Sequence, residues 1–300
     1  MMNKYIELTK DVADAINHRK PIVALESTII SHGMPYPRNI NVAEKLENIA
    51  SQMGVVPATI CLMNGKIKIG LEDEDLEILA KAGNVAKVSS RDIGRVLASK
   101  QAGATTVAAT MKAAAWAGIK VFATGGIGGV HRNAEDTFDI SNDLLELSRV
   151  PVIVVSAGAK AILDLPKTLE YLETLGVPVY GYKTDKLPAF YSAESDLTVD
   201  RLDDPNEFAA IHRTNTELGL NCGMLVTNPI PKEYEIPFGE MDKYIQTALE
   251  KADKLNIIGR DLTPFLLKEI VEITKGRSLE TNIKLVENNV RLACEIAKEF

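Results

Sequence analysis

The sequence of 300 residues predicts an α/β protein built on a layered, mixed sheet. Short apolar runs rich in β-branched residues alternate with amphipathic segments from near the N-terminus to at least Asn228, which is typical of alternating strands and helices. Hydrophobic residues make up 46% of the chain and charged residues 25%, a composition that excludes disorder and supports a large core. Asn64-Gly65 lies between two apolar runs and predicts a hairpin turn, so at least one strand pair is antiparallel.

The predicted strands are short and apolar, and amphipathic segments fill most of the intervals between them. The strand ranges are Pro21–Glu26, Thr59–Met63, Lys66–Gly70, Ala86–Ser89, Thr105–Ala109, Lys120–Thr124, Val152–Ser156, Val177–Tyr182 and Met224–Thr227. The helix ranges are Val42–Met53, Arg91–Lys100, Ala108–Ala117, Asn142–Leu147, Ala161–Thr174, Glu207–Leu218, Pro264–Thr274 and Ser278–Lys298. The alanine-rich helix, with Trp116, is expected to be buried.

One large domain spanning residues 1–300 is the preferred organisation. The chain has no internal repeat, no low-complexity segment and no polar linker long enough to separate two domains. The proline-dense segment Pro229–Pro237 is predicted to be a loop, or a lid over an edge of the fold, rather than a domain boundary.

Charge and cysteine content indicate a soluble cytoplasmic protein. The chain has 41 acidic and 34 basic side chains, a formal charge of −7, which disfavours nucleic-acid polymers as partners. The N-terminus resembles no secretory signal, and no stretch approaches the ~20 apolar residues that span a bilayer. The three cysteines, Cys61, Cys222 and Cys294, are scattered and have neither metal-ligand spacing nor a disulfide pattern.

Candidate chemistry lies where strands end, because ligands of open α/β sheets bind beyond the carboxyl ends of the strands. Lys160 follows an apolar strand and precedes the helix predicted from Ala161. The positive end of that helix and partial desolvation would favour a neutral, nucleophilic amine, and the alternative is an exposed lysine or a phosphate contact. Glu26 ends another strand, where burial would suit a general acid, and the alternative is a structural acid that accepts backbone N–H groups.

Two further segments carry polar groups that a ligand could use. The glycine-rich run 125–132 (GGIGGVHR) resembles a phosphate cradle without matching the dinucleotide or Walker motifs, and a tight turn for chain reversal is the alternative. The segment Asp136–Asp143 is rich in oxygen ligands for Mg²⁺ or Mn²⁺, although spacing alone favours Ser141 as a helix N-cap. Lys87 offers a second cation near the same sheet edge, or is an exposed lysine.

The four histidines do not have metal-ligand spacing. His32 and His131 lie in the loops that follow strands and are expected near a ligand, whereas His18 and His212 lie in helical segments and are expected to be incidental.

Four long motifs follow one another along the chain. They are LESTIISHGMPYPRN (Leu25–Asn39), KVSSRD (Lys87–Asp92), ATGGIGGVHRNAEDTFDISNDL (Ala123–Leu144) and SAGAKAILDLPKTLEYLETLGVPV (Ser156–Val179). Together they resemble the pseudouridine-5'-phosphate glycosidase family, also called the indigoidine synthase A-like family. The resemblance implies a three-layer α/β/α sandwich around a large mixed sheet, a homotrimer and a divalent ion, Mn²⁺ or Mg²⁺. The implied reaction is reversible: pseudouridine 5'-phosphate and water give uracil and ribose 5-phosphate.

The resemblance also implies roles for individual residues. It assigns the proton donor to Glu26, the nucleophile that forms a Schiff base to Lys160, and the metal contact to Asp139. The implied substrate contacts are Lys87, the backbone of Val107, His131, Ser141, Asn142, Asp143 and Asn282.

Three positions depart from the family pattern. Asn133 stands where glycine is common, which is tolerable because asparagine adopts positive φ more readily than most residues. Ser156 stands where cysteine is common, and Ser90 where arginine is common. The absence of that arginine removes one cation and bears on how phosphate is held.

Two other functions compete with this prediction. A class I aldolase-like lyase would use the same lysine on a different C–C bond, and would not release uracil. A nucleotide-sensing module would bind without turnover, but the co-occurrence of Glu26, Lys87 and Lys160 with an acidic segment favours catalysis.

Overall fold

The computed structural model describes residues 3–81, 83–257 and 262–300, and within these ranges one sheet holds 11 strands. The strands are β1 (Ile6–Leu8), β2 (Ile22–Leu25), β3 (Val56–Met63), β4 (Lys66–Ile69), β5 (Ala86–Val88), β6 (Gly103–Thr105), β7 (Val121–Ala123), β8 (Ile153–Ser156), β9 (Val179–Tyr182), β10 (Asp200–Leu202) and β11 (Met224–Thr227). Their order is β1-β4-β3-β2-β7-β8-β11-β9-β10, with β6 paired to β3 and β5 to β6. β3 is antiparallel to β4 and β6, whereas β2, β7, β8, β11 and β9 run parallel, so the predicted mixed sheet is confirmed.

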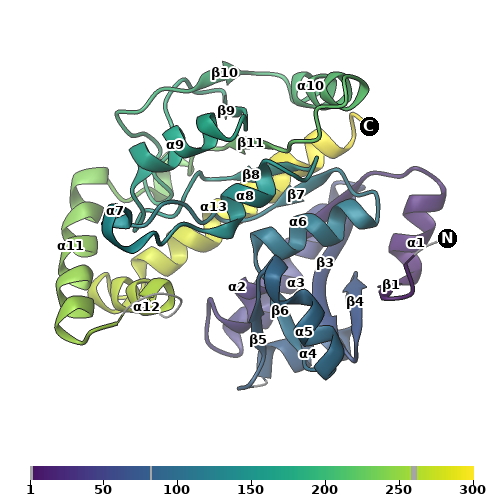
Figure 1. Ribbon diagram of the computed structural model, residues 1–300, viewed down its shortest axis with the longest axis horizontal. Helices are drawn as coiled ribbons and strands as arrows, with labels where there is room; N and C mark the ends of the chain where they lie inside the picture. Colours follow the sequence, from purple (N-terminus) through teal and green to yellow (C-terminus); the bar gives the residue numbers. More distant parts are fainter. Residues whose placement is uncertain (1–2, 82, 258–261) are drawn as a thin grey trace.

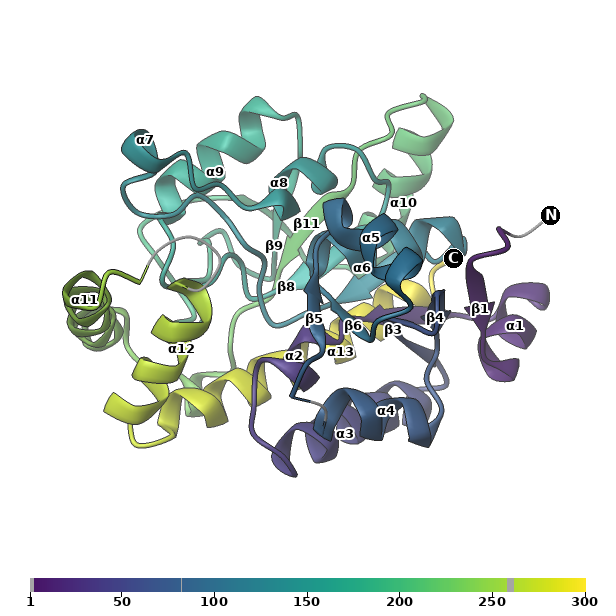
Figure 2. The same ribbon diagram turned by 60° about the horizontal axis from the view of Figure 1, so that its bottom comes forward.

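Helices cover both faces of the sheet (Figures 1 and 2). The α-helices are α1 (Lys10–Asn17), α2 (Thr28–Ser31), α3 (Arg38–Gln52), α4 (Asp73–Lys81), α5 (Ile93–Ser99), α6 (Val107–Trp116), α7 (Ala134–Thr137), α8 (Asn142–Leu147), α9 (Leu165–Thr174), α10 (Pro205–Glu217), α11 (Phe238–Lys254), α12 (Leu262–Ile273) and α13 (Arg277–Ala297), and the 3-10 turns are η1 (Ser90–Asp92) and η2 (Lys232–Tyr234). The long helix α13 packs on β2, β7 and β8, with α3 and α10 beside it, while α6 and α8 pack together on the opposite face. The three-layer α/β/α sandwich is therefore confirmed.

The hairpin of β3 and β4 forms where the sequence predicts it. Asn64 and Gly65 both have positive φ, 54° and 77°, which is the backbone conformation that a two-residue turn requires. Met63 pairs with Lys66 on either side of the turn, and the ladder continues to Ile60 and Ile69. The alternation of buried and half-buried residues along β4 follows from its place near the sheet edge.

Two predicted boundaries around the candidate loops are wrong. The segment Thr105–Ala109 is not a strand, because β6 ends at Thr105 and α6 begins at Val107. A short apolar run fits a buried helix as well as a buried strand, and here the alanines continue as helix. The helix predicted from Ala161 begins only at Leu165, where Asp164 caps it by accepting the N–H of Lys167.

Other differences concern surface and peripheral elements. Trp116 is 49% exposed and is not buried, because it lies at the last residue of α6. Helix α11 was not predicted, although Met241, Ile245 and Ala248 form a buried stripe of helical spacing. Pro229–Pro237 is a loop, as predicted. It also contains the 3-10 turn η2, which was not predicted, and its Ile236 is buried.

No helix within the described ranges is long and apolar enough to cross a membrane. Cys61, Cys222 and Cys294 are all free thiols, and Cys61 and Cys294 are buried.

Two glycines that lie in different backbone conformations give a paired stability test. Gly65→Ala is expected to lower the free energy of unfolding by about 1 kcal/mol, because a β-carbon is unfavourable at φ 77° and would lie 3.3 Å from the Leu97 carbonyl oxygen. Gly94→Ala, in the helix α5 with open space around it, is expected to raise the free energy of unfolding by about 0.5–1 kcal/mol. Denaturant titration measures both, and shifts of the same sign in the two variants would contradict the assigned turn.

Candidate active site

Glu26 lies at the carboxyl end of β2, where neighbouring elements hold both of its carboxylate oxygens. Thr124, which directly follows β7, donates its hydroxyl hydrogen to one oxygen, and Thr28, at the start of α2, donates to the other. β2 and β7 are adjacent parallel strands, so their ends meet at one edge of the sheet. Glu26 is half-buried, and these two hydrogen bonds orient its carboxylate.

Lys160 lies on a loop that continues the sheet beyond β8. The Ile127 N–H donates to the Gly158 carbonyl (3.1 Å), and the Lys160 N–H donates to the Ile127 carbonyl (3.1 Å). The glycine-rich segment after β7 and the Lys160 loop after β8 therefore run side by side. The helix-dipole argument for Lys160 is wrong, because α9 begins five residues later, but the lysine does lie at the same sheet edge as Glu26.

The glycines of the 125–129 segment are required by close packing. A β-carbon at Gly126 would lie 2.6 Å from the Phe190 ring, and one at Gly128 would lie 2.2 Å from Ser141 Oγ. Neither glycine has positive φ, so chain reversal is not the reason for them. The loop is thus held against the protein on several sides, and the Gly128 N–H is already used by Asp143 at 2.8 Å.

Asp143 ties the glycine-rich loop to two helices. Its buried carboxylate accepts the N–H of Ala108 in the first turn of α6 (2.9 Å) and the N–H of Gly128 (2.8 Å). Ser141 caps α8 by accepting the Asp143 N–H (3.2 Å), which confirms the predicted cap. Val107, the first residue of α6, is consequently held beside the same loop. Both oxygens of Asp143 therefore have protein partners.

Asn142 and Ser90 belong to a second polar cluster under the KVSS segment. The Asn142 amide donates to Ser90 Oγ (2.6 Å), and the Ser90 hydroxyl donates to Glu146 (2.7 Å). Lys112 of α6 pairs with the other oxygen of Glu146 at 3.1 Å. The cluster joins η1, α6 and α8, and places the segment that follows Lys87 against Asn142.

His131 and Asp139 face each other across the loop that holds α7. The backbone N–H of His131 donates to the backbone carbonyl of Asp139 (3.0 Å). In the side chains, His131 Nδ1 lies 4.0 Å from Asp139 Oδ2. Burial lowers the pKa of the His131 imidazole, and the Asp139 carboxylate opposes that shift. The ammonium groups of Lys160 and Lys87 lower the His131 pKa further. The side chains of Asp139, Lys160 and Lys87 are therefore each within electrostatic reach of His131.

Of the other histidines, only His32 belongs to this region. Desolvation, and then the positive charge of Lys87, lower the pKa of the His32 imidazole. His18 pairs with Asp14 at the exposed end of α1. His212 belongs to α10, and its Nε2 lies 3.0 Å from the carbonyl oxygen of Pro151.

Helix α13 packs against the residues that follow β7. A β-carbon at Gly125 would lie 3.2 Å from Asn282 Oδ1, so Asn282 lies against the start of the glycine-rich segment. Asn289, two turns further along, donates to the Thr124 carbonyl (2.8 Å). The sequence analysis missed Thr28, Thr124 and Asn289. Thr124 could have been found as the polar residue that ends its strand, whereas nothing in the sequence links Asn289 to it.

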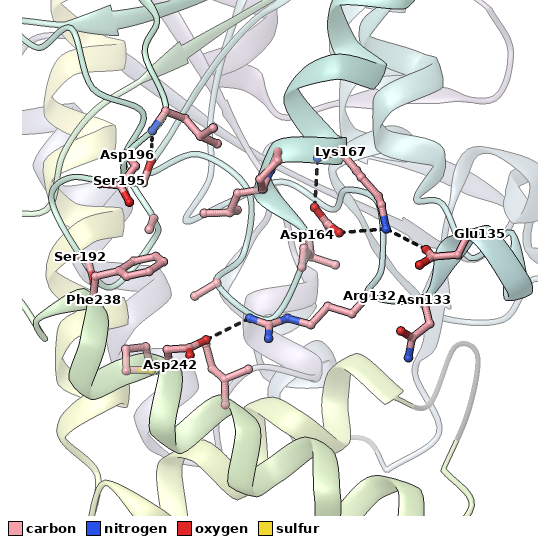
Figure 3. A pocket seen from close by; sticks show the side chains of 18 residues that line it. Arg132, Asn133, Glu135, Asp164, Lys167, Ser192, Ser195, Asp196, Phe238 and Asp242 are labelled. Atoms are coloured by element: carbon pink, nitrogen blue, oxygen red, sulfur yellow. Dashed lines mark hydrogen bonds and ion pairs between the residues drawn. The ribbon is translucent and has the colours of Figure 1, made fainter.

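A cavity of about 510 Å³ adjoins this region (Figure 3). Its walls are the segments that follow His131 and Lys160, the loop around residues 189–197, and α11. Arg132 reaches into it and pairs with Asp242 of α11 at 3.4 Å, while Lys167 pairs with Glu135 and Asp164 (Figure 3). Because Arg132 follows His131 directly, the cavity flanks the residues gathered at the strand ends.

The donor set for a metal ion is small. Among the described residues, no group of three or more His, Cys, Asp or Glu side chains could hold a metal ion. The Asp139 side chain is 35% exposed and stands beside His131. One accessible carboxylate fits a divalent ion that keeps most of its water and takes further oxygen ligands from a substrate.

Comparison with known proteins assigns the chain to a family. The sequence profile of the family described as Indigoidine synthase A like protein matches residues 11–299. The chain belongs to this family. The pseudouridine-5'-phosphate glycosidase of Petrotoga mobilis is 56% identical over 297 residues, which cover 99% of this chain and 97% of that protein. The enzyme of the same name from Staphylococcus aureus is 55% identical over 297 residues, with the same coverage.

Solved structures agree with this family assignment. The prealnumycin C-glycosynthase AlnA, in complex with ribulose 5-phosphate, has a TM-score of 0.92 and 39% identity over 99% of this chain and 97% of that one. An indigoidine synthase A-like protein from Thermotoga maritima has a TM-score of 0.89 and 36% identity, with the same coverage.

The three departures from the family pattern have local explanations. Asn133 has φ 62°, so asparagine occupies a left-handed position as expected. Ser156 Oγ accepts the Gly158 N–H (3.2 Å) and so shapes the turn before Lys160. Ser90 binds Glu146, so its side chain serves the buried cluster.

The pKa of His131 tests whether these side chains meet. We expect the pKa of the imidazole to lie below its ordinary value, and Asp139→Asn to lower this pKa further, because a charge that favours imidazolium is removed. Lys160→Met is expected to raise the His131 pKa, because a repelling ammonium is removed. NMR titration of the imidazole, assigned with His131→Gln, measures each shift. Shifts in the opposite directions would contradict the arrangement.

Proposed function

We propose that this chain is a pseudouridine-5'-phosphate glycosidase. The observation that carries the proposal is the placement of an oriented acid, Glu26 after β2, and a lysine, Lys160 after β8, at one edge of the sheet, on either side of the loop that follows β7. Relatives of that name at 53–56% identity over nearly the whole chain support it. The structural neighbour AlnA is named a C-glycosynthase and binds ribulose 5-phosphate, which supports chemistry at a C–C bond of a pentose phosphate.

The bond to be cleaved explains why an acid and an amine are needed together. Ordinary glycosidases protonate an oxygen leaving group between two carboxylates. Here the leaving atom is a carbon of uracil, so a carboxylate pair is insufficient. An amine bonded to C1' can supply the electron pair that expels this carbon and can then be released by water.

The proposed reaction proceeds in three stages. Glu26 supplies a proton to the ring oxygen as the ribose opens, and the Lys160 amine forms a bond to C1'. The nitrogen bonded to C1' loses a proton to the Glu26 carboxylate. The bond between C1' and the uracil carbon then breaks, Glu26 donates that proton to the carbon, and the nitrogen lone pair forms an iminium with C1'. Water adds to the iminium and breaks the C–N bond, which releases ribose 5-phosphate and the free amine of Lys160.

Substrate contacts are proposed for the residues that surround these two groups. Lys87 supplies a cation for the phosphate, and the backbone of Val107 lies in the first turn of α6, whose N–H groups favour anions. Ser141, Asn142 and His131 line the same edge, with Asn282 behind the glycine-rich segment. Asp143 is proposed to act from its buried position, where it holds the N–H groups of Ala108 and Gly128.

Asp139 is proposed to hold a divalent ion, Mn²⁺ or Mg²⁺. When bound, such an ion would stabilise negative charge on substrate oxygens. The Asp139 carboxylate supports this role because it is accessible and lies on the same loop as His131.

We also propose that the enzyme acts in the cytoplasm and assembles as a homotrimer. The free thiols of Cys61, Cys222 and Cys294 suit a reducing compartment. The Phe138 side chain is 82% exposed directly beside Asp139, and aromatic side chains are enriched at interfaces between proteins.

Incubation with pseudouridine 5'-phosphate and Mn²⁺ tests the activity. We expect release of uracil, and after borohydride reduction in the presence of ribose 5-phosphate we expect an adduct on the peptide that contains Lys160. Lys160→Met is expected to lose both the adduct and about 10³-fold or more in kcat. Lys87→Met serves as the control, because it should keep the adduct while raising KM. An adduct on another lysine, or turnover of a sugar phosphate without uracil release, would refute the assignment.

Metal dependence tests the role of Asp139. Chelation is expected to lower the activity of the parent enzyme and added Mn²⁺ to restore it. Asp139→Ala is expected to lower activity with partial rescue at high Mn²⁺, because waters can replace a lost carboxylate ligand only weakly. Asp136→Ala, an exposed acid three residues earlier, should retain parental activity. Full activity of metal-free parent enzyme would contradict a metal role for Asp139.

A further inference from the structure

Two buried amide side chains lie behind the proposed acid and nucleophile. Asn289 of α13 is fully buried, and its Nδ2 donates to the Thr124 carbonyl (2.8 Å) and to the Gly125 carbonyl (3.4 Å). Asn228 follows β11, is 5% exposed, and donates its Nδ2 to Asn289 Oδ1 (3.1 Å). We call the pair Asn228 and Asn289 the amide bridge.

The amide bridge joins the end of β7, whose Thr124 contacts Glu26, to the end of β8, which leads to Lys160. At one end, Asn289 holds Thr124, whose hydroxyl donates to Glu26. At the other end, the Asn228 N–H donates to the Ser156 carbonyl (2.8 Å), and Ser156 precedes the loop that leads to Lys160. Hydrogen bonds through Thr124, Asn289 and Asn228 therefore link the acid to Ser156, where the loop that carries Lys160 begins.

Only a side chain that both donates and accepts can fill the central position. The Thr124 carbonyl is buried and needs a donor, while the Asn228 amide needs an acceptor. A carboxylate at position 289 could not donate, and an aliphatic side chain could do neither. Asparagine at position 289 therefore satisfies both neighbours in a region closed to water.

We propose that Asn289 is a positioning residue that sets the separation of the Glu26 carboxylate from the Lys160 amine. This inference rests on the proposed function. Proton transfer and bond formation at neighbouring atoms are sensitive to displacements of about 1 Å, which can cost ~10²-fold in rate. Most of the proposed substrate contacts, such as Lys87 and Asn142, lie on other elements, so binding should change less than the chemical step.

Kinetics of Asn289→Ala test the proposal. We expect kcat to fall about 10- to 100-fold with KM within about threefold of the parent, because Asn289 no longer holds the residue whose hydroxyl donates to Glu26. For the same reason we expect the acid limb of the pH profile of kcat to shift. Asn228→Ala, which leaves both carbonyl contacts of Asn289 in place, should give a smaller decrease in kcat.

Asn288→Ala is the matched control. Asn288 is the neighbouring residue on α13, and its amide donates to the Pro229 carbonyl (3.0 Å). The Asn288→Ala variant should have a lower free energy of unfolding than the parent, but the same kcat and the same pH profile. A value of kcat for Asn289→Ala within about twofold of the parent, or an equal decrease in kcat for Asn288→Ala, would overturn the proposal.

Hydrogen exchange separates this inference from the proposed function. In folded Asn289→Ala, peptides covering residues 121–129 and 153–160 should exchange faster than in the parent, whatever the substrate. Unchanged exchange in both peptides would overturn the amide bridge even in an active enzyme. Absence of uracil release by the parent would refute the proposed function alone. If Asn289→Ala does not fold, the same kinetic and exchange comparisons on Asn228→Ala decide the question.

Discussion

The parallel pairing of β7 with β2 on one side and with β8 on the other is the constraint on which the candidate site depends. Parallel strands in register end at the same edge, so residues from three distant parts of the chain come within reach of one another. Glu26 follows β2 and Thr124 follows β7, and the loop after β8 leads to Lys160. The three strands themselves are apolar except for Ser156 at the end of β8, so their polar side chains stand where the strands end.

Close packing turns this common edge into a defined geometry. Glycines at 126 and 128 let the loop after β7 lie against Phe190 and Ser141, where any β-carbon would collide. The Asp143 carboxylate then fixes the loop to the first turn of α6 through two backbone N–H groups. The glycine-rich segment thus resembles a phosphate cradle in sequence, but the N–H of Gly128 already donates to Asp143, which holds the loop in place.

Sequence patterns predicted the sheet better than they predicted its connections. The strand at Val152–Ser156 and the hairpin at Asn64-Gly65 follow from local apolar runs and turn chemistry, which need no distant partner. The strand predicted at Thr105–Ala109 was wrong because a short buried apolar run does not distinguish strand from helix. The proposed roles of Glu26 and Lys160 came from motifs. The predicted helix from Ala161, which was to favour a neutral Lys160 amine, is wrong, because α9 begins at Leu165.

The sequence by itself determined the α/β class, the family and the residue types available for chemistry, because these depend on composition, local periodicity and contiguous motifs. Only the tertiary structure decided which groups meet: Thr124 with Glu26, His131 with Asp139, and Asn289 with the end of β7. Asn289 lies 165 residues from Thr124 along the chain, and their contact depends on how α13 crosses the finished sheet. Contacts of that kind are set by packing between distant elements, and no local pattern in the sequence encodes them.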